Sequence, residues 1–100
     1  MKKSATLINT ARGPVVDQEA LIEALEEGKL SRAALDVTYI EPIDIKDKLL
    51  SLPNVIIAPH IASASVNTRL KMANMAVDNL IAGFSGERLI NCANPTVYNT

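Results

Sequence analysis

Three short apolar runs, separated by polar and helix-like segments, set the pattern of the chain. They are Ala5–Asn9, Arg32–Val37 and Val55–Ala58. Between the first two, Leu21 and Leu25 lie four residues apart with further apolar residues beside them, which predicts an amphipathic helix. Short apolar runs alternating with helices are typical of parallel strands buried on both faces. The pattern therefore predicts an α/β fold in three layers, an incomplete second half of a Rossmann-like parallel sheet with flanking helices.

Capping residues suggest where the helices begin and end. Asp17 is a natural N-cap for the first helix, and Gly28 is placed to end it. The segment KLLSLPN has room for one helical turn before the third strand. A longer helix is expected from near Ser65 to near Ala82, closed by Gly83. We expect the remaining tail to be loop-like, with a brief extended piece at Leu89–Asn91.

Composition and charge narrow the class of protein. Of 100 residues, 48% are apolar, and ten basic residues against eleven acidic ones give a net charge of −1. Because no basic cluster stands out, we expect no nucleic-acid partner, and no run reaches the ~20 apolar residues of a membrane span. The single cysteine, Cys92, fits a reducing compartment, so a cytoplasmic protein is expected. One histidine and one cysteine are too few for a zinc site.

Polar side chains stand where each expected strand ends. Arg12 follows the first, Asp36 and Glu41 lie at and beyond the end of the second, and His60 follows the third. In open parallel sheets, ligands bind outside the carboxyl ends of the strands. An arginine can clamp a carboxylate substrate, a histidine can transfer a proton, and an acid can orient that histidine and favour its charged form.

Each of these residues also has a purely structural interpretation. Arg12 could be a solvated loop residue, Glu41 a turn residue before Pro42, and His60 a hydrogen-bonded structural histidine. Asp36 is harder to explain in this way, because a carboxylate within an apolar run must be paired or hydrogen-bonded. Because such residues occur at three successive strand ends, a shared site is favoured over four unrelated structural roles.

Three segments carry a resemblance to a known family. LINTARGPVVDQEALIEAL, AALDVTYIEP and LPNVIIAPHIASAS resemble, in order and spacing, the signatures of the D-isomer-specific 2-hydroxyacid dehydrogenases. This family includes glyoxylate/hydroxypyruvate reductases and glycerate, D-lactate and phosphoglycerate dehydrogenases. The match covers about Met1 to Gly83 and extends loosely to NCANPTVY.

The resemblance implies roles for single residues. It makes Arg12 the substrate-binding arginine, His60 the catalytic acid/base and Glu41 the carboxylate paired with that histidine. Ala62 stands where the family usually has glycine, which adds one methyl group near the nicotinamide. The residues implied to contact NAD or NADP are Thr10, Ala11, Arg12, Asp36, His60 and Ala62.

The implied reaction is hydride transfer between NAD(P)H and a small 2-oxo acid such as glyoxylate or hydroxypyruvate. Residues 1–83 would be the C-terminal half of the NAD(P)-binding domain, and residues 84–100 a tail that returns to the substrate domain. Because the chain has neither the family's glycine-rich fingerprint nor its substrate domain, we expect a fragment that is inactive in isolation. A homodimer or other self-association is also expected. The alternative is a corepressor-like, NAD(H)-sensing binding or scaffold protein of the same fold.

Overall fold

The computed structural model describes residues 1–99, which form two compact units that divide between Ala62 and Ser63. The expected division at residue 83 concerns whole domains of a longer enzyme and stays a prediction. The first unit contains β1 (Thr6–Asn9), η1 (Gly13–Val15), α1 (Gln18–Glu26), β2 (Arg32–Leu35), η2 (Lys48–Ser51) and β3 (Val55–Ile57), and the second contains α2 (Val66–Phe84) and η3 (Pro95–Asn99).

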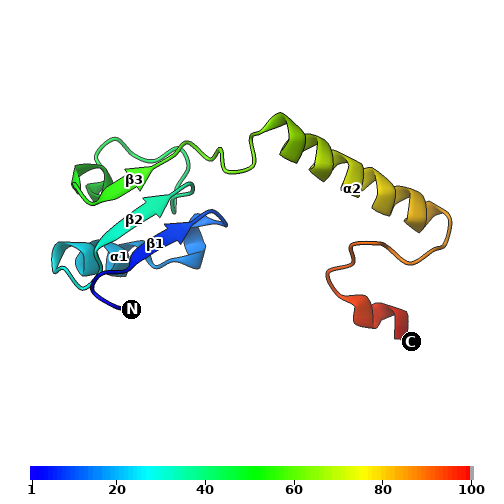
Figure 1. Ribbon diagram of the computed structural model, residues 1–100, viewed down its shortest axis with the longest axis horizontal. Coiled ribbons are helices and arrows are strands. Elements are labelled where there is room, and N and C mark those ends of the chain that lie inside the picture. The colour runs from blue at the N-terminus through cyan, green and yellow to red at the C-terminus, as the bar shows by residue number, and fades with distance from the viewer. Residues whose placement is uncertain (100) are drawn as a thin grey trace. The chain divides into compact units, whose positions relative to one another are not determined.

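The three strands form one parallel sheet in the order β1-β2-β3 (Figure 1). Thr6 pairs with Arg32, and Ala33 pairs with Val55, so the carboxyl ends of all three strands reach the same edge. This arrangement confirms the expected incomplete, Rossmann-like α/β sheet. It also brings the segments that follow the strands next to one another, as the sequence predicted.

The hydrophobic core lies between α1 and one face of the sheet. Leu21 and Leu25 of α1 pack against Ala33 and Leu35 of β2, and Leu49 of η2 closes the cluster with 1% of its surface exposed. Burial of a leucine side chain contributes about 2 kcal/mol. Leu21 and Leu25 therefore hold α1, and the residues at its N-terminal end, in a fixed position against the sheet.

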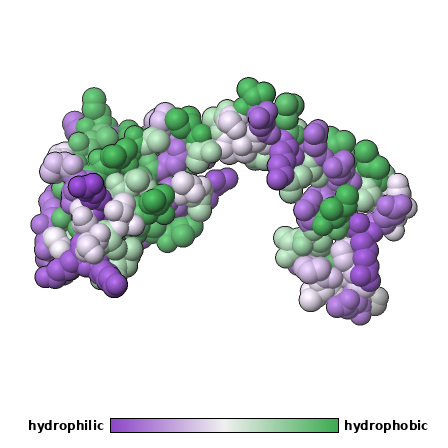
Figure 2. Space-filling model, in the orientation of Figure 1, coloured by the Kyte–Doolittle hydropathy of each residue, from purple (hydrophilic) through white to green (hydrophobic). Residues whose placement is uncertain are grey.

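The opposite face of the sheet is open within residues 1–62, so the expectation of strands buried on both faces is wrong for this unit. Ile8 of β1 is 70% exposed and Ile56 of β3 is 72% exposed. These side chains alternate with the inward-facing ones because successive residues of a strand point to opposite faces. Hydrophobic residues are accordingly visible on the surface in Figure 2.

The ends of α1 are as predicted. The Asp17 carboxylate accepts a hydrogen bond from the N–H of Ala20 at 3.1 Å, which satisfies a free donor of the first turn. Gly28 follows the helix with φ of 65°, the left-handed conformation that glycine adopts with little cost.

The second helix, α2, begins as expected but ends later. Ser65 caps it by accepting a hydrogen bond from the N–H of Thr68 at 3.2 Å. Gly83, expected to close the helix, lies inside it, and the left-handed residue is Gly86 with φ of 71°. The N–H of Ser85 still reaches the carbonyl of Ile81, so the helical ladder continues past Gly83. No helix among residues 1–99 combines the length and apolar character needed to cross a membrane.

The segment between α2 and η3 forms no strand, and residues 90–91 are in a turn, contrary to the expectation of an extended piece at Leu89–Asn91. The N–H of Leu89 donates to the Tyr98 hydroxyl at 2.9 Å, and the N–H of Asn91 donates to Asn79 Oδ1 at the same distance. Side chains, not a neighbouring strand, therefore satisfy these backbone groups. The tail ends in the short helix η3, which the sequence pattern did not predict.

Gly13 allows two loops of the first unit to approach closely. It is buried at the start of η1, and a Cβ atom at this position would lie 1.9 Å from the Thr38 carbonyl oxygen. No other residue type fits without moving one of the two backbones. The loop after β1 is therefore packed directly against the loop after β2.

We expect Gly13→Ala to destabilise the first unit by about 3 kcal/mol, because overpacking against backbone atoms cannot relax through a rotamer change. Gly28→Ala is the matched control: its Cβ would meet nothing within 4 Å, and only the left-handed φ costs about 1 kcal/mol. Urea unfolding followed by circular dichroism measures both. A free energy of unfolding for Gly13→Ala within 0.5 kcal/mol of the parent would contradict the close packing.

Candidate active site

The buried polar residues of the first unit gather where β1 and β2 end. Asn9, Asp36 and Thr38 are 6%, 8% and 7% exposed. No buried side-chain nitrogen or oxygen atom in residues 1–99 lacks a hydrogen-bond partner. Burial of a polar group is costly unless it is hydrogen-bonded, so these three residues are expected to hold the surrounding loops in place.

Asn9 shapes the turn that presents Arg12. Its Oδ1 accepts from the N–H of Ala11 at 3.0 Å, and its Nδ2 donates to the carbonyl of Arg12 at 2.9 Å. Asparagine commonly forms such turns with the residues that follow it. Thr10, Ala11 and Arg12 are exposed beyond the strand, and Nη1 of Arg12 donates to the carbonyl of Ala11 at 2.6 Å.

The Asp36 carboxylate joins the end of β2 to the segment after β3. Its Oδ1 accepts from the N–H of Ile61 at 2.8 Å, and its Oδ2 accepts from the N–H of Ala62 at 2.9 Å. The Ala62 N–H is the largest cause that lowers the pKa of this carboxyl below its ordinary value. The Ile61 N–H and the charge of His60 act in the same direction, and desolvation opposes them. Asp36 is therefore a stabilised carboxylate.

Glu41 and His60 are the only ionisable side chains of the strand-end segments that contact each other in the described residues. Oε2 of Glu41 lies 2.8 Å from Nδ1 of His60, and Oε1 accepts from the N–H of Thr38 at 3.1 Å. The Thr38 hydroxyl donates to the carbonyl of Ile40 at 2.7 Å and closes the turn that leads to Glu41. Both oxygens of Glu41 are thus held.

The charge state of Glu41 fixes the direction of its bond to His60. The hydrogen bond from His60 is the largest cause that lowers the pKa of Glu41, followed by the Thr38 N–H and, more weakly, by the charges of His60 and Arg12. At neutral pH Glu41 is ionised and can only accept. Nδ1 of His60 must therefore carry a hydrogen, which leaves Nε2 as the atom that can exchange a proton with a ligand.

His60 has an unusual backbone conformation. Its φ is 55°, the left-handed region that residues with a Cβ rarely adopt. Such a residue costs on the order of 1 kcal/mol and persists only where neighbouring contacts fix it. The two residues that follow it donate their N–H groups to Asp36. Asp36 thereby holds the backbone that directs His60 towards Glu41.

The expected site residues divide into two groups. Glu41 and His60 are in direct contact, and Arg12 acts on Glu41 through its charge. Thr10, Asp36 and Ala62 line one hollow of about 300 Å³ on the open face of the sheet, whose walls are otherwise apolar. A second hollow, of about 350 Å³, has Asp36, Glu41 and His60 on its wall. Asp36 borders both, whereas Ala11 lines neither.

Sequence reasoning did not identify Asn9 and Thr38 as parts of this site. An asparagine at the end of a strand is a recognised turn signal, so Asn9 could have been found in this way. Thr38 acts through its backbone N–H, which donates to Glu41, and through its hydroxyl, which donates to Ile40. No sequence pattern predicts the bond from the backbone N–H.

Asp36→Asn should destabilise the first unit at pH 7 and flatten the dependence of its stability on pH. The pKa of Asp36 is lower in the folded chain, so its carboxylate stabilises the fold above the unfolded value near 3.9. That contribution is lost as pH falls through the lowered folded value. Urea midpoints at pH 7 and pH 3 measure both effects, with Glu19→Gln as the control for charge on the exposed face of α1. An Asp36→Asn chain with the parent's midpoint at both pH values would refute this account.

Comparisons with known proteins identify relatives of this chain. Residues 1–62 match the family described as D-isomer specific 2-hydroxyacid dehydrogenase, NAD binding domain. The chain is 55% identical over 97 residues to glyoxylate/hydroxypyruvate reductase B of Yersinia enterocolitica, which covers 97% of this chain and 30% of that protein. It is 56% identical over 95 residues to the Serratia proteamaculans reductase of the same name, covering 95% and 29%. The chain thus spans about 30% of the length of these relatives.

Solved structures show the same relationship. An NADPH-dependent glyoxylate/hydroxypyruvate reductase from Sinorhizobium meliloti, in complex with NADP and malonate, is 45% identical with a TM-score of 0.77, covering 94% of this chain and 29% of that one. A D-isomer specific 2-hydroxyacid dehydrogenase from Xanthobacter autotrophicus, in complex with NADPH and MES, is 37% identical with a TM-score of 0.80, covering 97% and 39%. The chain belongs to the D-isomer-specific 2-hydroxyacid dehydrogenase family, and its residues 1–62 match part of the NAD-binding domain.

Proposed function

We propose that this chain supplies the proton-transfer half of an active site that interconverts a small 2-oxo acid and its 2-hydroxy acid with NAD(P)H. The observation that carries the proposal is the 2.8 Å contact between Glu41 and His60 at the carboxyl edge of the parallel sheet. Glyoxylate and hydroxypyruvate are the substrates named for its relatives, and we propose the same class here.

His60 is the general acid of the reduction. When the imidazole is protonated, Nδ1–H stays bonded to the Glu41 carboxylate and Nε2–H faces the substrate oxygen. As the carbonyl carbon is reduced, that oxygen takes the Nε2 proton and the imidazole becomes neutral. In the oxidation, Nε2 takes the proton back from the hydroxyl group. Such general acid–base catalysis contributes about 10²- to 10⁴-fold to a rate.

Arg12 is proposed to bind the substrate carboxylate. Its guanidinium lies on an exposed turn and is near enough to Glu41 to lower the pKa of that carboxyl. A guanidinium has five N–H donors in a planar fork that matches a carboxylate. A 2-oxo acid held there is proposed to have its oxo group beside the histidine, because the charge of Arg12 acts on Glu41, the partner of His60.

The dinucleotide is proposed to lie along the hollow bordered by Thr10, Asp36 and Ala62. Bound NAD(P)H would supply the hydride. The apolar walls of the hollow suit the face of a nicotinamide ring. The Asp36 carboxylate, although it already accepts two N–H groups, has further lone pairs for a carboxamide donor. Thr10 and Ala11, on the turn that Asn9 holds, and the neighbouring Arg12 and His60 complete the proposed contacts.

Two further proposals concern the state of the protein. Along α2, Leu70, Val77, Ile81 and Phe84 form an apolar stripe whose members are 51% to 86% exposed. A stripe of this kind favours contact with a second copy of the chain. Cys92, the single cysteine, is free, in keeping with a reducing, cytoplasmic location.

The test is a chimera in which this chain replaces the matching segment of the Yersinia enterocolitica reductase. It should oxidise NADH or NADPH with glyoxylate or hydroxypyruvate, and His60→Ala should lower its kcat by about 10²- to 10⁴-fold at neutral pH. Lys46→Ala, on an exposed loop, is the control and should keep the parent rate. The 100-residue chain alone should show no turnover and weak NADH binding.

Two results would contradict this proposal. A His60→Ala chimera that keeps the parent kcat would exclude His60 as the proton donor. Micromolar affinity of the isolated chain for NADH would show that the chain contains a complete cofactor site.

A further inference from the structure

We propose that Gln18 is a positioning residue for the Glu41–His60 pair: it ties both ends of the loop that carries Glu41, residues 39–47, to the first turn of α1. The inference deepens the proposed function, and it rests on that function only where it assigns a catalytic role to the Glu41–His60 pair. Whether Gln18 holds the pair can be measured without substrate or cofactor.

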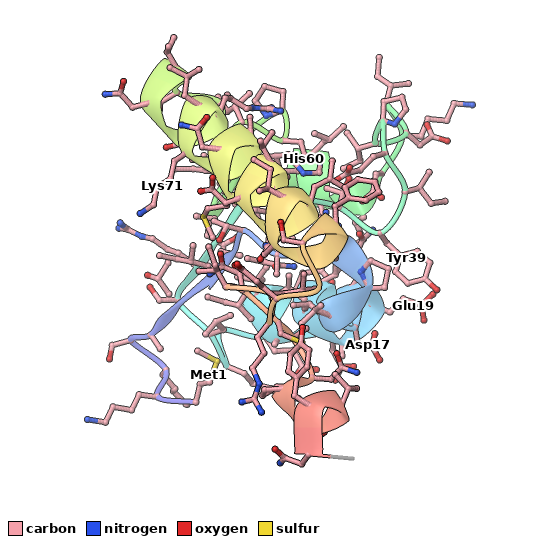
Figure 3. All side chains as sticks on the ribbon, turned by 90° about the vertical axis from the view of Figure 1, so that its right-hand side faces the viewer. Met1, Asp17, Glu19, Tyr39, His60 and Lys71 are labelled. Atoms are coloured by element: carbon pink, nitrogen blue, oxygen red, sulfur yellow. The ribbon has the colours of Figure 1, made fainter. Side chains whose placement is uncertain are left out.

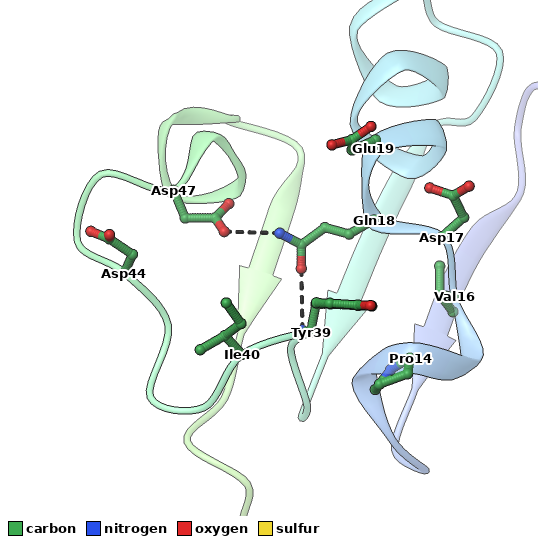
Figure 4. A pocket seen from close by; sticks show the side chains of 9 residues that line it. All are labelled: Pro14, Val16, Asp17, Gln18, Glu19, Tyr39, Ile40, Asp44 and Asp47. Atoms are coloured by element: carbon green, nitrogen blue, oxygen red, sulfur yellow. Dashed lines mark hydrogen bonds between the residues drawn. The ribbon is translucent and has the colours of Figure 1, made fainter.

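Both polar atoms of the Gln18 side chain are used. Nε2 donates to Oδ2 of Asp47 at 2.8 Å, and Oε1 accepts from the backbone N–H of Tyr39 at 3.2 Å. Figure 4 shows the amide between these two partners, at the wall of a hollow of about 550 Å³. Tyr39 is the first residue of the loop and Asp47 the last, so one side chain closes the loop at both ends.

The loop ends lead directly to the pair. Tyr39 follows Thr38, whose N–H donates to Glu41. At the other end, Oδ1 of Asp47 accepts from the N–H of Leu49 at 2.9 Å and caps η2, which holds the buried Leu49. A shift at either end would move the Thr38 N–H or the chain on the far side of Glu41. Between its ends the loop is exposed, apart from the partly buried Ile43. The hydrogen bonds at its two ends therefore largely fix the conformation of the loop.

Gln18 is itself firmly placed. It is the first residue of α1, directly after the N-cap Asp17. The helix is fixed to the sheet by Leu21 and Leu25. Asp17, Glu19 and Tyr39 lie around this end of the helix (Figure 3). Gln18 therefore transmits the position of a helix that is packed on the sheet to an exposed loop.

The chemistry of the residue matters as well as its place. An amide supplies one donor for the Asp47 carboxylate and one acceptor for the Tyr39 N–H. A carboxylate at position 18 could still accept from Tyr39 but would repel Asp47. The pair of substitutions Q18E/D47N reverses donor and acceptor: the new amide at position 47 donates to the new carboxylate at position 18 and still accepts from Leu49. Net charge is unchanged.

The experiment is a carboxyl carbon NMR titration of Glu41, together with the pH response of the Thr38 amide, in the full 100-residue chain. In Q18A we expect the pKa of Glu41 to rise towards the ordinary value of about 4.3, because the bonds that lower it loosen. The Thr38 amide should respond less to that titration. Q18E/D47N should restore both signals to those of the parent.

D47N separates anchoring from simple charge effects. Removal of a negative charge would by itself lower the pKa of Glu41, whereas loss of the anchor raises it. We expect it to rise. Glu19→Gln removes the same charge from the first turn of α1, beside Gln18, and should not raise the pKa of Glu41.

The proposal is overturned if Q18A keeps the parent titration, or if D47N lowers the pKa of Glu41. It is also overturned if Q18E/D47N behaves like Q18A or fails to fold. Loss of the dispersed amide signals of β1–β3 in Q18A alone would mean that this variant is unfolded. The proposal is then tested by the Glu41 titrations of D47N and Q18E/D47N. In the chimera, Q18A should lower kcat more than it changes KM. If the Glu41 titration changes as expected but kcat in the chimera does not, the result would count against the proposed function. The role of Gln18 in positioning the Glu41–His60 pair would still be supported.

Discussion

The Asp36 carboxylate, which accepts the N–H groups of Ile61 and Ala62, is the interaction on which the candidate site depends. It comes at the end of a strand whose other residues are almost all apolar, and it is buried. Both hydrogen bonds are charge-assisted and so stronger than neutral ones. Their donors are the N–H groups of the two residues that directly follow His60. The left-handed backbone of His60 is therefore stabilised by its neighbours and not by its own preference.

The three strand ends are joined in sequence. The Asn9 carbonyl accepts from the N–H of Asp36 at 2.9 Å, and the Leu35 carbonyl accepts from the N–H of Ala58 at 2.8 Å. Gly13 adds a backbone-to-backbone contact with Thr38. These bonds extend the sheet into the loops, so a guanidinium, a carboxylate and an imidazole carried by three separate loops share one edge. Function on this scaffold depends on loops that a regular sheet holds rigidly.

Asp36 also illustrates how a structural and a functional role can coincide. Family resemblance assigns it to the cofactor, whereas the geometry assigns it to the backbone after His60. Both are compatible, because a carboxylate can accept about four hydrogen bonds. The same residue would then position both His60 and the proposed nicotinamide site.

Much of the fold, and the convergence of the site, followed from the sequence for physical reasons. Period-two and period-3.6 patterns are local, and parallel strands must bring Arg12, Glu41 and His60 to one edge. Several features could not be read in this way. Gly83 and Gly86 are both plausible helix ends, and only the capping hydrogen bonds choose between them. Three features depend on tertiary contacts that no local pattern encodes: the open face of the sheet, the left-handed backbone of His60, and the hydrogen bonds of Gln18. Gln18 bonds to Tyr39 and Asp47, which are 21 and 29 positions further along the chain.

The most direct test of this account is the ring ¹⁵N spectrum of His60, the single histidine of the chain, in the parent and in Asp36→Asn. For the parent, recorded at a pH where the imidazole is neutral, the account predicts that the ring hydrogen lies on Nδ1, bonded to Glu41. Asp36→Asn should release the backbone after His60 and shift the ring towards the Nε2–H tautomer. An unchanged tautomer in Asp36→Asn, or a parent ring with its hydrogen on Nε2, would contradict the claim that Asp36 holds His60 against Glu41.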